Sequence, residues 1–279
     1  MQTTASFLDN RADDWRDCLN GSLRFLRESW ATDWVGLAFV VDACAHFLNL
    51  NMTQQSVTGA KLLTIAKTLA LQIEEGAARN ASRDEPHYHN RLHFADVLTI
   101  ITVQVAIEST RCRPKDPDWL AAVLLIAIAH DLNHPGRVNR FCAEIEQMSV
   151  NVLRPHLQAH AVADVWVQRI EDVILASDFT LVAKNHARVS GRAFAWNKDW
   201  VSVLLNEADV MASVLEEFGG DLSRALASEW ALVSFPGHRT VATAQGRRDF
   251  LATTLFSSDS ASRLGAPIDR DKQLSDTST

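Results

Sequence analysis

The feature that most limits the fold of this chain is a helical periodicity that recurs in almost every apolar segment. In residues 57–78, apolar side chains at Leu62, Ile65, Leu69 and Ile73 follow one another at intervals of three or four. This spacing places them on one face of an α-helix. No run of alternating apolar and polar residues indicates a strand, and no segment repeats. The sequence therefore predicts an all-α fold, a compact bundle of many helices.

Further helices follow from the same pattern. They are expected at residues 93–108, 118–130, 141–157, 163–177, 200–218, 222–233 and 245–256. The loop 111–119 contains two prolines, and Asp118 within it is a candidate N-cap for the next helix. Gly219-Gly220 is expected to separate two helices. We expect one domain over residues 1–256 and a polar, disordered tail over residues 257–279.

Composition excludes several classes of function. The 279 residues carry a formal charge of −7 with a pI of about 5.8, which disfavours a nucleic-acid polymer as partner. The first residues lack the basic and apolar regions of a signal peptide, and the apolar stretches are too short to span a bilayer. Four scattered cysteines without a CxxC pair indicate reduced thiols. We therefore expect a cytoplasmic protein without a membrane partner, and a homodimer stays open.

The first candidate functional residues are two histidines in one short segment. In YHNRLHFAD at residues 88–96, His89 and His93 are four apart, so on a helix they share a face. Such a pair by itself is more often a surface pair or a satisfied core pair than a functional one. The segment becomes informative only together with the residues that follow.

A His-Asp pair ends an apolar helix further along the chain. In AHDLNHPG at residues 129–136, His130 and Asp131 follow the apolar run directly, and His134 comes one turn later. Packing does not explain the pair, because both side chains are costly to bury unpaired. Asp209 lies in another strongly apolar segment. Two imidazoles and two carboxylates suit Zn²⁺, Mn²⁺ or Fe²⁺ better than Ca²⁺ or a thiolate-preferring metal.

The order His…His-Asp…Asp resembles the HD superfamily of metal-dependent phosphohydrolases. The forms YHNxxHxxDV and HDxxHPGxxNxF resemble the signature of class I 3′,5′-cyclic nucleotide phosphodiesterases, with this chain as a divergent, bacterial-type member. ILASDF at 174–179 and NEADV at 206–210 are similar to the family's ATDM-type and CADL-type segments. The resemblance covers about residues 85–215. It implies an HD-type helical bundle and a phosphodiester hydrolase with a small-molecule substrate.

The resemblance also implies a role for each matched residue. The tighter of two divalent ions, Zn²⁺, Fe²⁺ or Mn²⁺, would be bound by His93, His130, Asp131 and Asp209. Asp131 would bridge to a second ion, Mg²⁺ or Mn²⁺, held largely by waters. His89 would be the general acid that protonates the leaving oxygen, and His134 would lie near the bridging water. General chemistry agrees, since a metal pair activates a shared water and a histidine titrates near working pH.

Four residues are candidate substrate contacts: Tyr88, Asn139, Gln245 and Phe250. Eukaryotic members of the resembled family hold a purine with a glutamine three residues before a phenylalanine. Here Gln245 and Phe250 are five apart, with Arg247 at the expected position, and no ENHH-type cluster follows HPG. We therefore expect stacking on Phe250 and little discrimination between adenine and guanine.

Three alternatives remain open. HD-type di-iron oxygenases use two further histidines, and His156, His160 and His186 lie between the His-Asp pair and Asp209. A non-catalytic, metal-bound sensor would lack the general acid, whereas His89 is present. An HD-type hydrolase could also act on a different phosphate ester, such as a nucleoside monophosphate or a linear phosphodiester.

Overall fold

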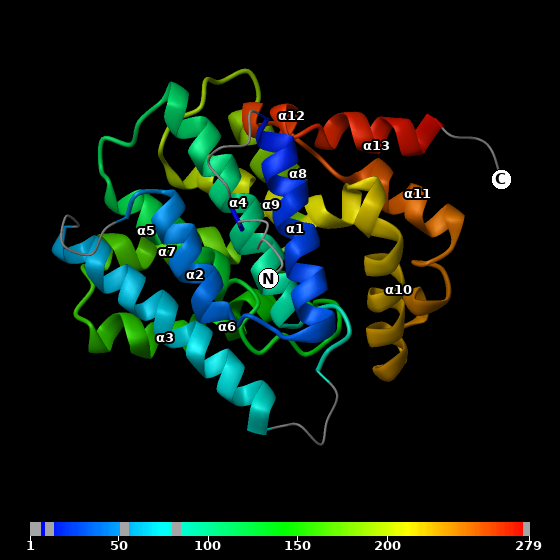
Figure 1. Cartoon of the computed structure of the whole chain (residues 1–279), viewed down its shortest axis with the longest axis horizontal. Coiled ribbons are helices and arrows are strands. Elements are labelled where there is room, and N and C mark those ends of the chain that lie inside the picture. The colour runs from blue at the N-terminus through cyan, green and yellow to red at the C-terminus, as the bar shows by residue number, and fades with distance from the viewer. Residues whose placement is uncertain (1–6, 9–13, 51–55, 80–84, 276–279) are drawn as a thin grey trace, which may run out of the picture.

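The computed structural model describes residues 7–8, 14–50, 56–79 and 85–275, and these form helices and loops without a strand (Figure 1). The predicted all-α fold is confirmed. The α-helices are α1 (Trp15–Thr32), α2 (Leu37–Phe47), α3 (Val57–Arg79), α4 (Arg91–Arg111), α5 (Asp118–Ala129), α6 (Glu144–Ala159), α7 (Asp164–Leu175), α8 (Val182–Val189), α9 (Lys198–Val214), α10 (Glu216–Leu232), α11 (Ala244–Thr253), α12 (Asp259–Arg263) and α13 (Ala266–Ser275). Two short 3-10 helices are η1 (Phe179–Leu181) and η2 (Pro236–Arg239).

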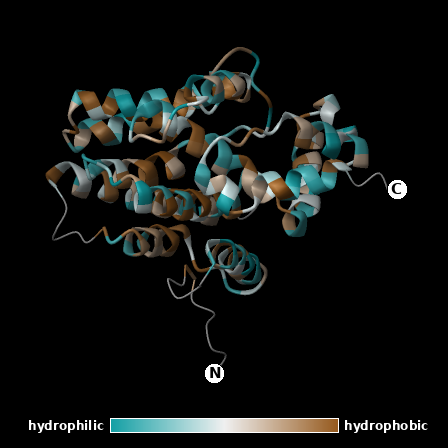
Figure 2. Ribbon diagram, turned by 90° about the horizontal axis from the view of Figure 1, so that it is seen from above, coloured by the Kyte–Doolittle hydropathy of each residue, from teal (hydrophilic) through white to brown (hydrophobic). Residues whose placement is uncertain are grey.

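Helices α4 and α5 form the centre of the fold. Most of their side chains are buried, polar ones included, as expected for helices enclosed on several sides. Helix α4 packs against α1, α2, α5 and α9, while α5 also packs against α3 (Figure 1). Hydrophobic segments gather where the helices face one another (Figure 2). The best-packed part of the molecule therefore holds the start of α4 and the end of α5.

Helix α4 is long and apolar enough to cross a membrane, and it is the one such helix in the described part of the chain. However, 83% of its most apolar window is buried inside the fold. Core helices of globular proteins meet the same criterion of length and composition. The apolar character of α4 is accounted for by its central packing.

The helix boundary expected at Gly219-Gly220 lies elsewhere. Helix α9 ends and α10 begins around Leu215, so both glycines are inside α10. A Cβ atom at position 219 would lie 2.2 Å from the carbonyl oxygen of Ser213. Glycine at this position therefore permits a close approach of two backbones and does not terminate a helix.

The expected N-cap of α5 is also different. Asp118 is the first residue of the helix, and its carboxylate accepts a hydrogen bond from the hydroxyl of Ser56. The backbone N–H of Asp118 donates to the side chain of Asp116 at 3.2 Å. The N-cap residue is Pro117, which has no capping side chain, so the expected capping role of Asp118 is wrong.

The expectation of a disordered tail is wrong for residues 257–275, which form α12 and α13; residues 276–279 lie outside the described part. Three apolar residues of this segment belong to the main hydrophobic cluster: Ala261, Leu264 and Ala266. The buried carboxylate of Glu207 in α9 accepts the backbone N–H groups of Ser257 and Ser258 at 2.6 and 2.9 Å. The polar composition of the segment conceals these buried partners.

Candidate metal centre and catalytic site

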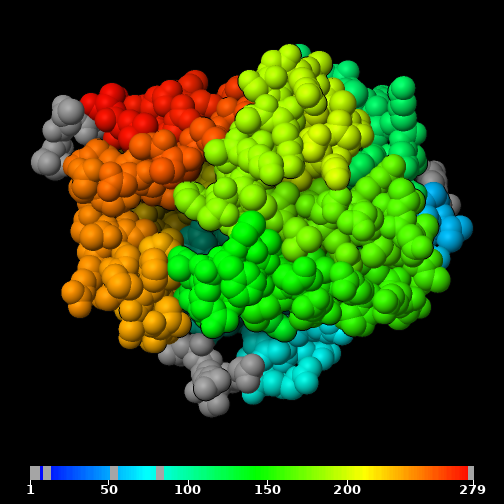
Figure 3. All heavy atoms as spheres, turned by 180° about the vertical axis from the view of Figure 1, so that it is seen from behind, coloured from blue at the N-terminus to red at the C-terminus, as the bar shows by residue number. Residues whose placement is uncertain are grey.

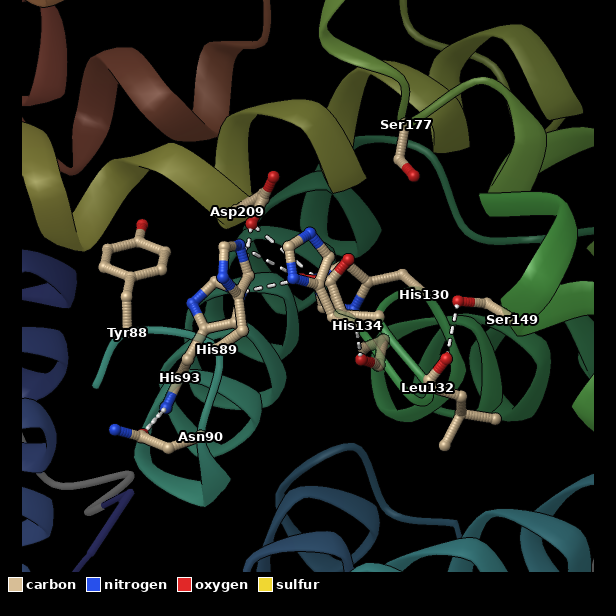
Figure 4. Close-up of polar contacts among 12 residues, drawn as sticks. Tyr88, His89, Asn90, His93, His130, Leu132, His134, Ser149, Ser177 and Asp209 are labelled. Atoms are coloured by element: carbon tan, nitrogen blue, oxygen red, sulfur yellow. Dashed lines mark hydrogen bonds and ion pairs between the residues drawn. The ribbon is translucent and has the colours of Figure 1, made fainter. Parts of the chain in front are cut away.

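The four predicted metal ligands come from three helices whose ends meet. His93 lies in the first turn of α4, His130 and Asp131 directly follow α5, and Asp209 lies in α9. The side chain of Asn90 caps α4 by accepting backbone N–H groups of its first turn, including that of His93 at 3.2 Å. Figure 4 shows Asp209 reaching from α9 towards the rings of His93 and His130. The helix framework therefore aims all of these side chains into one region.

These side chains bring two imidazole nitrogens and two carboxylate oxygens together. His93 Nε2 lies 3.3 Å from Asp131 Oδ2 and 3.2 Å from Asp209 Oδ1. His130 Nε2 lies 3.3 and 3.7 Å from the same two oxygens. One possible ligand atom of each residue lies within 4.8 Å of the others. The set predicted from the sequence thus converges on one point.

The hydrogen bonding of this cluster suits a bound cation. His130 Nδ1 lies 2.8 Å from the carbonyl oxygen of Ala127, so Nδ1 carries the proton and donates it. A neutral His130 then presents a lone pair at Nε2. His93 and His130 are only 4% and 1% exposed, and neither Nε2 has a hydrogen-bond partner among the described residues. Buried, unpartnered nitrogens facing two carboxylates fit a divalent metal ion.

The pKa values in the cluster point the same way. Burial alone lowers the pKa of His93, but the negative charges of the adjacent Asp131 and Asp209 carboxylates raise it to about 9. Burial alone raises the pKa of each carboxyl group, but the two histidines hold both pKa values below their ordinary range. The cluster therefore attracts positive charge, and a divalent ion would displace the protons that otherwise supply it.

A second cluster lies beside the first and pairs His89 with Glu229 of α10. His89 Nδ1 is 2.5 Å from Glu229 Oε1, and Glu229 Oε2 accepts the backbone N–H groups of Tyr88 and His89 at 2.8 and 2.9 Å. Burial alone raises the pKa of Glu229, but its bonds with His89 lower it to about 2. The ionised carboxylate makes Nδ1 a donor, and the other ring nitrogen, Nε2, lies 4.0 Å from Asp131 Oδ2.

Glu229 is a site residue that the sequence did not predict. It is 2% exposed and lies 140 positions from the histidine it binds. In the sequence it is one acidic residue of an amphipathic helical segment, like the exposed glutamates of α10. No local signal distinguishes it. Only the packing of α10 against α9 brings it to His89.

His134 stacks on His89, with ring centroids 3.5 Å apart and 22° between the ring planes. Its Nδ1 accepts the backbone N–H of Gly136 at 3.1 Å. Burial lowers the pKa of His134 to about 4, so the ring is neutral near pH 7. The stacked ring therefore restrains the orientation of His89 without carrying charge.

Tyr88 and Asn139, two of the candidate substrate contacts, are engaged within the protein. The Tyr88 ring lies 5.0 Å from that of His93, and its hydroxyl is 3.1 Å from Ser213 Oγ. The Asn139 side chain donates to buried Glu146 at 2.9 Å and accepts the N–H of Ile145 at 2.8 Å. Tyr88 thus supports the histidines, and Asn139 shapes the loop between α5 and α6.

Gln245 and Phe250, the other two candidates, lie on α11. The exposed amide of Gln245 donates to Asp249 at 2.7 Å and accepts from Arg248 at 3.0 Å, both on its own helix. Neither residue lines a cavity next to the metal-binding cluster. The described contacts of Gln245 therefore stay within α11, and a role of this pair in holding a base stays a prediction.

Two cavities adjoin the cluster. The larger, which we call the α3 cavity, has a volume of about 440 Å³ and lies between α3 and three site residues, His89, Asp131 and His134. The smaller has about 40 Å³ and is lined by Asp209 and Phe179. Figure 3 also shows the surface hollowed between the orange C-terminal helices and the green segment after α5, with teal atoms at its floor. The centre is therefore approachable by a small molecule.

The histidines of the oxygenase alternative are not part of either cluster. His160 Nδ1 contacts the carbonyl oxygen of His156 at 2.9 Å at the end of α6. His186 is buried in α8 and its Nδ1 contacts Ser257 Oγ at 2.7 Å. In the described part of the chain, the groups suited to a metal consist of the two clusters above. The additional histidine ligands of an oxygenase are therefore not supplied by these residues.

Comparison with known proteins agrees with this geometry. Residues 88–152 match the family model of 3′5′-cyclic nucleotide phosphodiesterase. A relative from Caenorhabditis elegans named "Probable 3′,5′-cyclic phosphodiesterase pde-3" is 31% identical over 105 residues. That match covers 28% of this chain and 16% of the relative, so the chain corresponds to a small part of that protein. Residues 88–152, which match the family model, contain His89, His134 and the pair His130-Asp131.

Proposed function

We propose that this chain, which is class I cyclic nucleotide phosphodiesterase-like across residues 88–152, is a divalent-metal-dependent hydrolase of 3′,5′-cyclic nucleotides. The observation that carries the proposal is the convergence of four ligand atoms within 4.8 Å beside the His89–Glu229 pair. The reaction would open the cyclic phosphodiester with water to give a nucleoside 5′-monophosphate.

His93, His130, Asp131 and Asp209 would hold the tighter ion, and Asp131 would reach a second. The short distances from Asp131 Oδ2 to both histidine nitrogens support this assignment. When bound, the ions would lower the pKa of the attacking water and offset the negative charge of the phosphate. We expect the tighter site to hold Zn²⁺, Fe²⁺ or Mn²⁺, which suit its donor set. We expect the second site to hold Mg²⁺ or Mn²⁺.

His89 would act as the general acid. With Nδ1–H donated to Glu229, a protonated His89 holds its second proton at Nε2, on the side that faces Asp131. As the bond between phosphorus and the 3′-oxygen breaks, that proton passes to the oxygen and yields the 3′-hydroxyl. Glu229 would stabilise the charged imidazole before the transfer, and stacked His134 would keep the ring in line.

The test is a hydrolysis panel on the metal-loaded protein with cAMP, cGMP, 2′,3′-cyclic nucleotides, dinucleotides and nucleoside monophosphates. We expect hydrolysis of the 3′,5′-cyclic nucleotides, and its loss in His93→Ala. If elemental analysis verifies bound metal and only the other esters are hydrolysed, the protein is instead the alternative, an HD-type hydrolase of a different phosphate ester. A cytoplasmic location and a homodimer remain predictions from the sequence.

A further inference from the structure

A third cavity, which we call the α8 cavity, lies between α7, α8 and α9. It has a volume of about 260 Å³, and neither His89 nor any of the four proposed metal ligands lines it. Its charged lining residues are Asp172, Lys184, Arg188, Lys198 and Asp199. The volume is just below the range of about 300–1,000 Å³ that is usual for drug-sized ligands. The α8 cavity therefore suits a smaller, polar molecule.

The charges around the α8 cavity leave one cation without a partner. Lys198 Nζ lies 2.7 Å from Asp172 Oδ2, and Arg188 Nη1 lies 4.0 Å from Asp199 Oδ1. The third basic side chain, that of Lys184, is exposed and has no ion pair or side-chain hydrogen bond among the described residues. The cavity thus has an excess of positive charge in a chain whose formal charge is −7. Such a surface favours an anionic ligand.

A buried amide that lines the α8 cavity needs a hydrogen-bond donor. Asn185 is 2% exposed, and its NH₂ group donates to the carbonyl oxygen of Ala176 at 2.7 Å and to Asn206 Oδ1 at 2.9 Å. Because the carbonyl oxygen of Ala176 can only accept, the orientation of the Asn185 amide is fixed. Its own oxygen accepts no hydrogen bond from the described residues. That oxygen is left to water or to a hydroxyl group of a ligand.

We infer that the α8 cavity is a second ligand site, which binds a small phosphate ester of a polyol. Lys184 supplies an unpaired positive charge for the phosphate group. Lys198 and Asp199 are the first two residues of α9, so the positive end of this helix also borders the cavity. A hydroxyl group of the polyol donates to the free oxygen of Asn185. This binding site does not depend on the proposed function.

The α8 cavity and the cavity beside Asp209 share one segment of chain. Ala176 lines the first cavity, whereas the next residue, Ser177, lines the second together with Asn206. The side chains of Asn185 and Asn206 both donate to the carbonyl oxygen of Ala176, at 2.7 and 3.3 Å. A ligand bound to Asn185 therefore acts on the hydrogen bonds that hold the wall of the catalytic site. This coupling rests on the proposed function.

Calorimetry of the full-length, metal-loaded protein tests the site with ribose 5-phosphate, and ribose serves as the neutral control. Each titration is repeated after metal removal by a chelator. Ribose 5-phosphate should bind in both states, because the α8 cavity contains no metal ligand, and ribose should not bind. Lys184→Ala should weaken binding by about tenfold or more, since it removes a charged partner of the phosphate. Lys115→Ala is the control, because Lys115 is also exposed and does not line the cavity.

Two results would overturn the binding site. Binding that disappears with the metal and is unchanged in Lys184→Ala would place ribose 5-phosphate at the metal centre. Absence of binding in both the metal-loaded and the chelated protein would exclude the α8 cavity as a site for this class of ligand. Inorganic phosphate that binds as tightly as ribose 5-phosphate would show that Asn185 recognises no hydroxyl group of a polyol, and the ligand class would be wrong.

Hydrolysis kinetics test the coupling. The KM for cAMP is measured with and without saturating ribose 5-phosphate in wild type, Lys184→Ala and Lys115→Ala. Competition at the metal centre is common to all three proteins, so coupling is the difference between them. The change in KM should differ by about twofold or more between wild type and Lys184→Ala, and Lys115→Ala should follow the wild type. Equal changes would overturn the coupling. Absence of cAMP hydrolysis in all three would instead overturn the proposed function, while calorimetry still decides on the site.

Discussion

His89 Nδ1 lies 2.5 Å from Glu229 Oε1, although the two residues are 140 positions apart in the chain. The contact joins the segment before α4 to α10 and makes Nδ1 the donor. The second nitrogen of the ring consequently faces the carboxylate of Asp131. A histidine oriented in this way is equipped to deliver a proton from Nε2, and the first prediction follows from that geometry.

Glu229→Gln should reduce turnover of cAMP by about 10- to 100-fold, because a neutral amide no longer stabilises the imidazolium form of His89. His89→Ala should lose about 10²–10⁴ in turnover while retaining its metals. A p-nitrophenyl ester should be affected much less in both variants, because its leaving oxygen needs no proton. Glu217→Gln, on the exposed side of the same helix, is the control. Equal losses on the two substrates would contradict a general-acid role.

Asp131→Ala should lose both metals, because this carboxylate would contact both, whereas Asp209→Ala should lose mainly the tighter one. Metal content is measured by elemental analysis of the purified variants. Asp221→Ala, an exposed aspartate of α10, should keep the wild-type content. Full metal retention in both site variants would refute the ligand assignment.

Leu264→Ala tests whether the C-terminal helices are part of the folded core. Leu264 is fully buried between α12 and α13, so its truncation should lower the free energy of unfolding by about 2–5 kcal/mol. Ile268→Ala, 65% exposed in the next helix, should change it by less than about 0.5 kcal/mol. Chemical denaturation measures both. A neutral Leu264→Ala would mean that this segment does not contribute to the core in solution.

His186 should make stability depend on pH. Burial lowers its pKa from 6.5 to about 4, so between these values the unfolded chain binds a proton that the folded protein does not. Stability from this group is therefore present above pH 6.5, falls as the pH drops through the window, and levels off below about pH 4. The full effect is about 3 kcal/mol.

The measurement is the difference in unfolding free energy between wild type and His186→Asn from pH 7.5 to pH 4. The variant should show a smaller loss across the window, because it has no group to titrate there. Replacing exposed His46 with Asn should leave the pH dependence of the wild type. An identical pH dependence in His186→Asn would exclude this histidine as a source.

Base selectivity should be weak. The metal-binding residues and His89 act on the phosphate and leaving oxygen, which all 3′,5′-cyclic nucleotides share. The values of kcat/KM for cAMP and cGMP should then differ by less than about tenfold, since Gln245 and Phe250 are five apart and the Gln245 amide is bound to Asp249 and Arg248 of its own helix. A preference of about a thousandfold would require a fixed hydrogen-bonding group that reads one base edge.

The sequence by itself determined the all-α class and the identity of the residues that meet at the cluster. Helical periodicity is a local property, so the helix around Leu62 and Leu69 can be predicted without knowing what it packs against. His130 and Asp131 can be recognised as functional residues for another reason. Burying a polar pair at the end of an apolar helix costs free energy unless a ligand binds the pair. Their order with His93 and Asp209 was sufficient to predict four residues that the structure brings together.

Only the tertiary structure decided what surrounds those residues. Glu229 resembles any exposed glutamate until α10 packs against α9, and residues 257–275 look disordered until Glu207 accepts their backbone N–H groups. The α3 cavity likewise exists only where α3 faces His89 and Asp131. Each of these features depends on contacts between residues far apart in the chain, and a local pattern carries no information about such contacts.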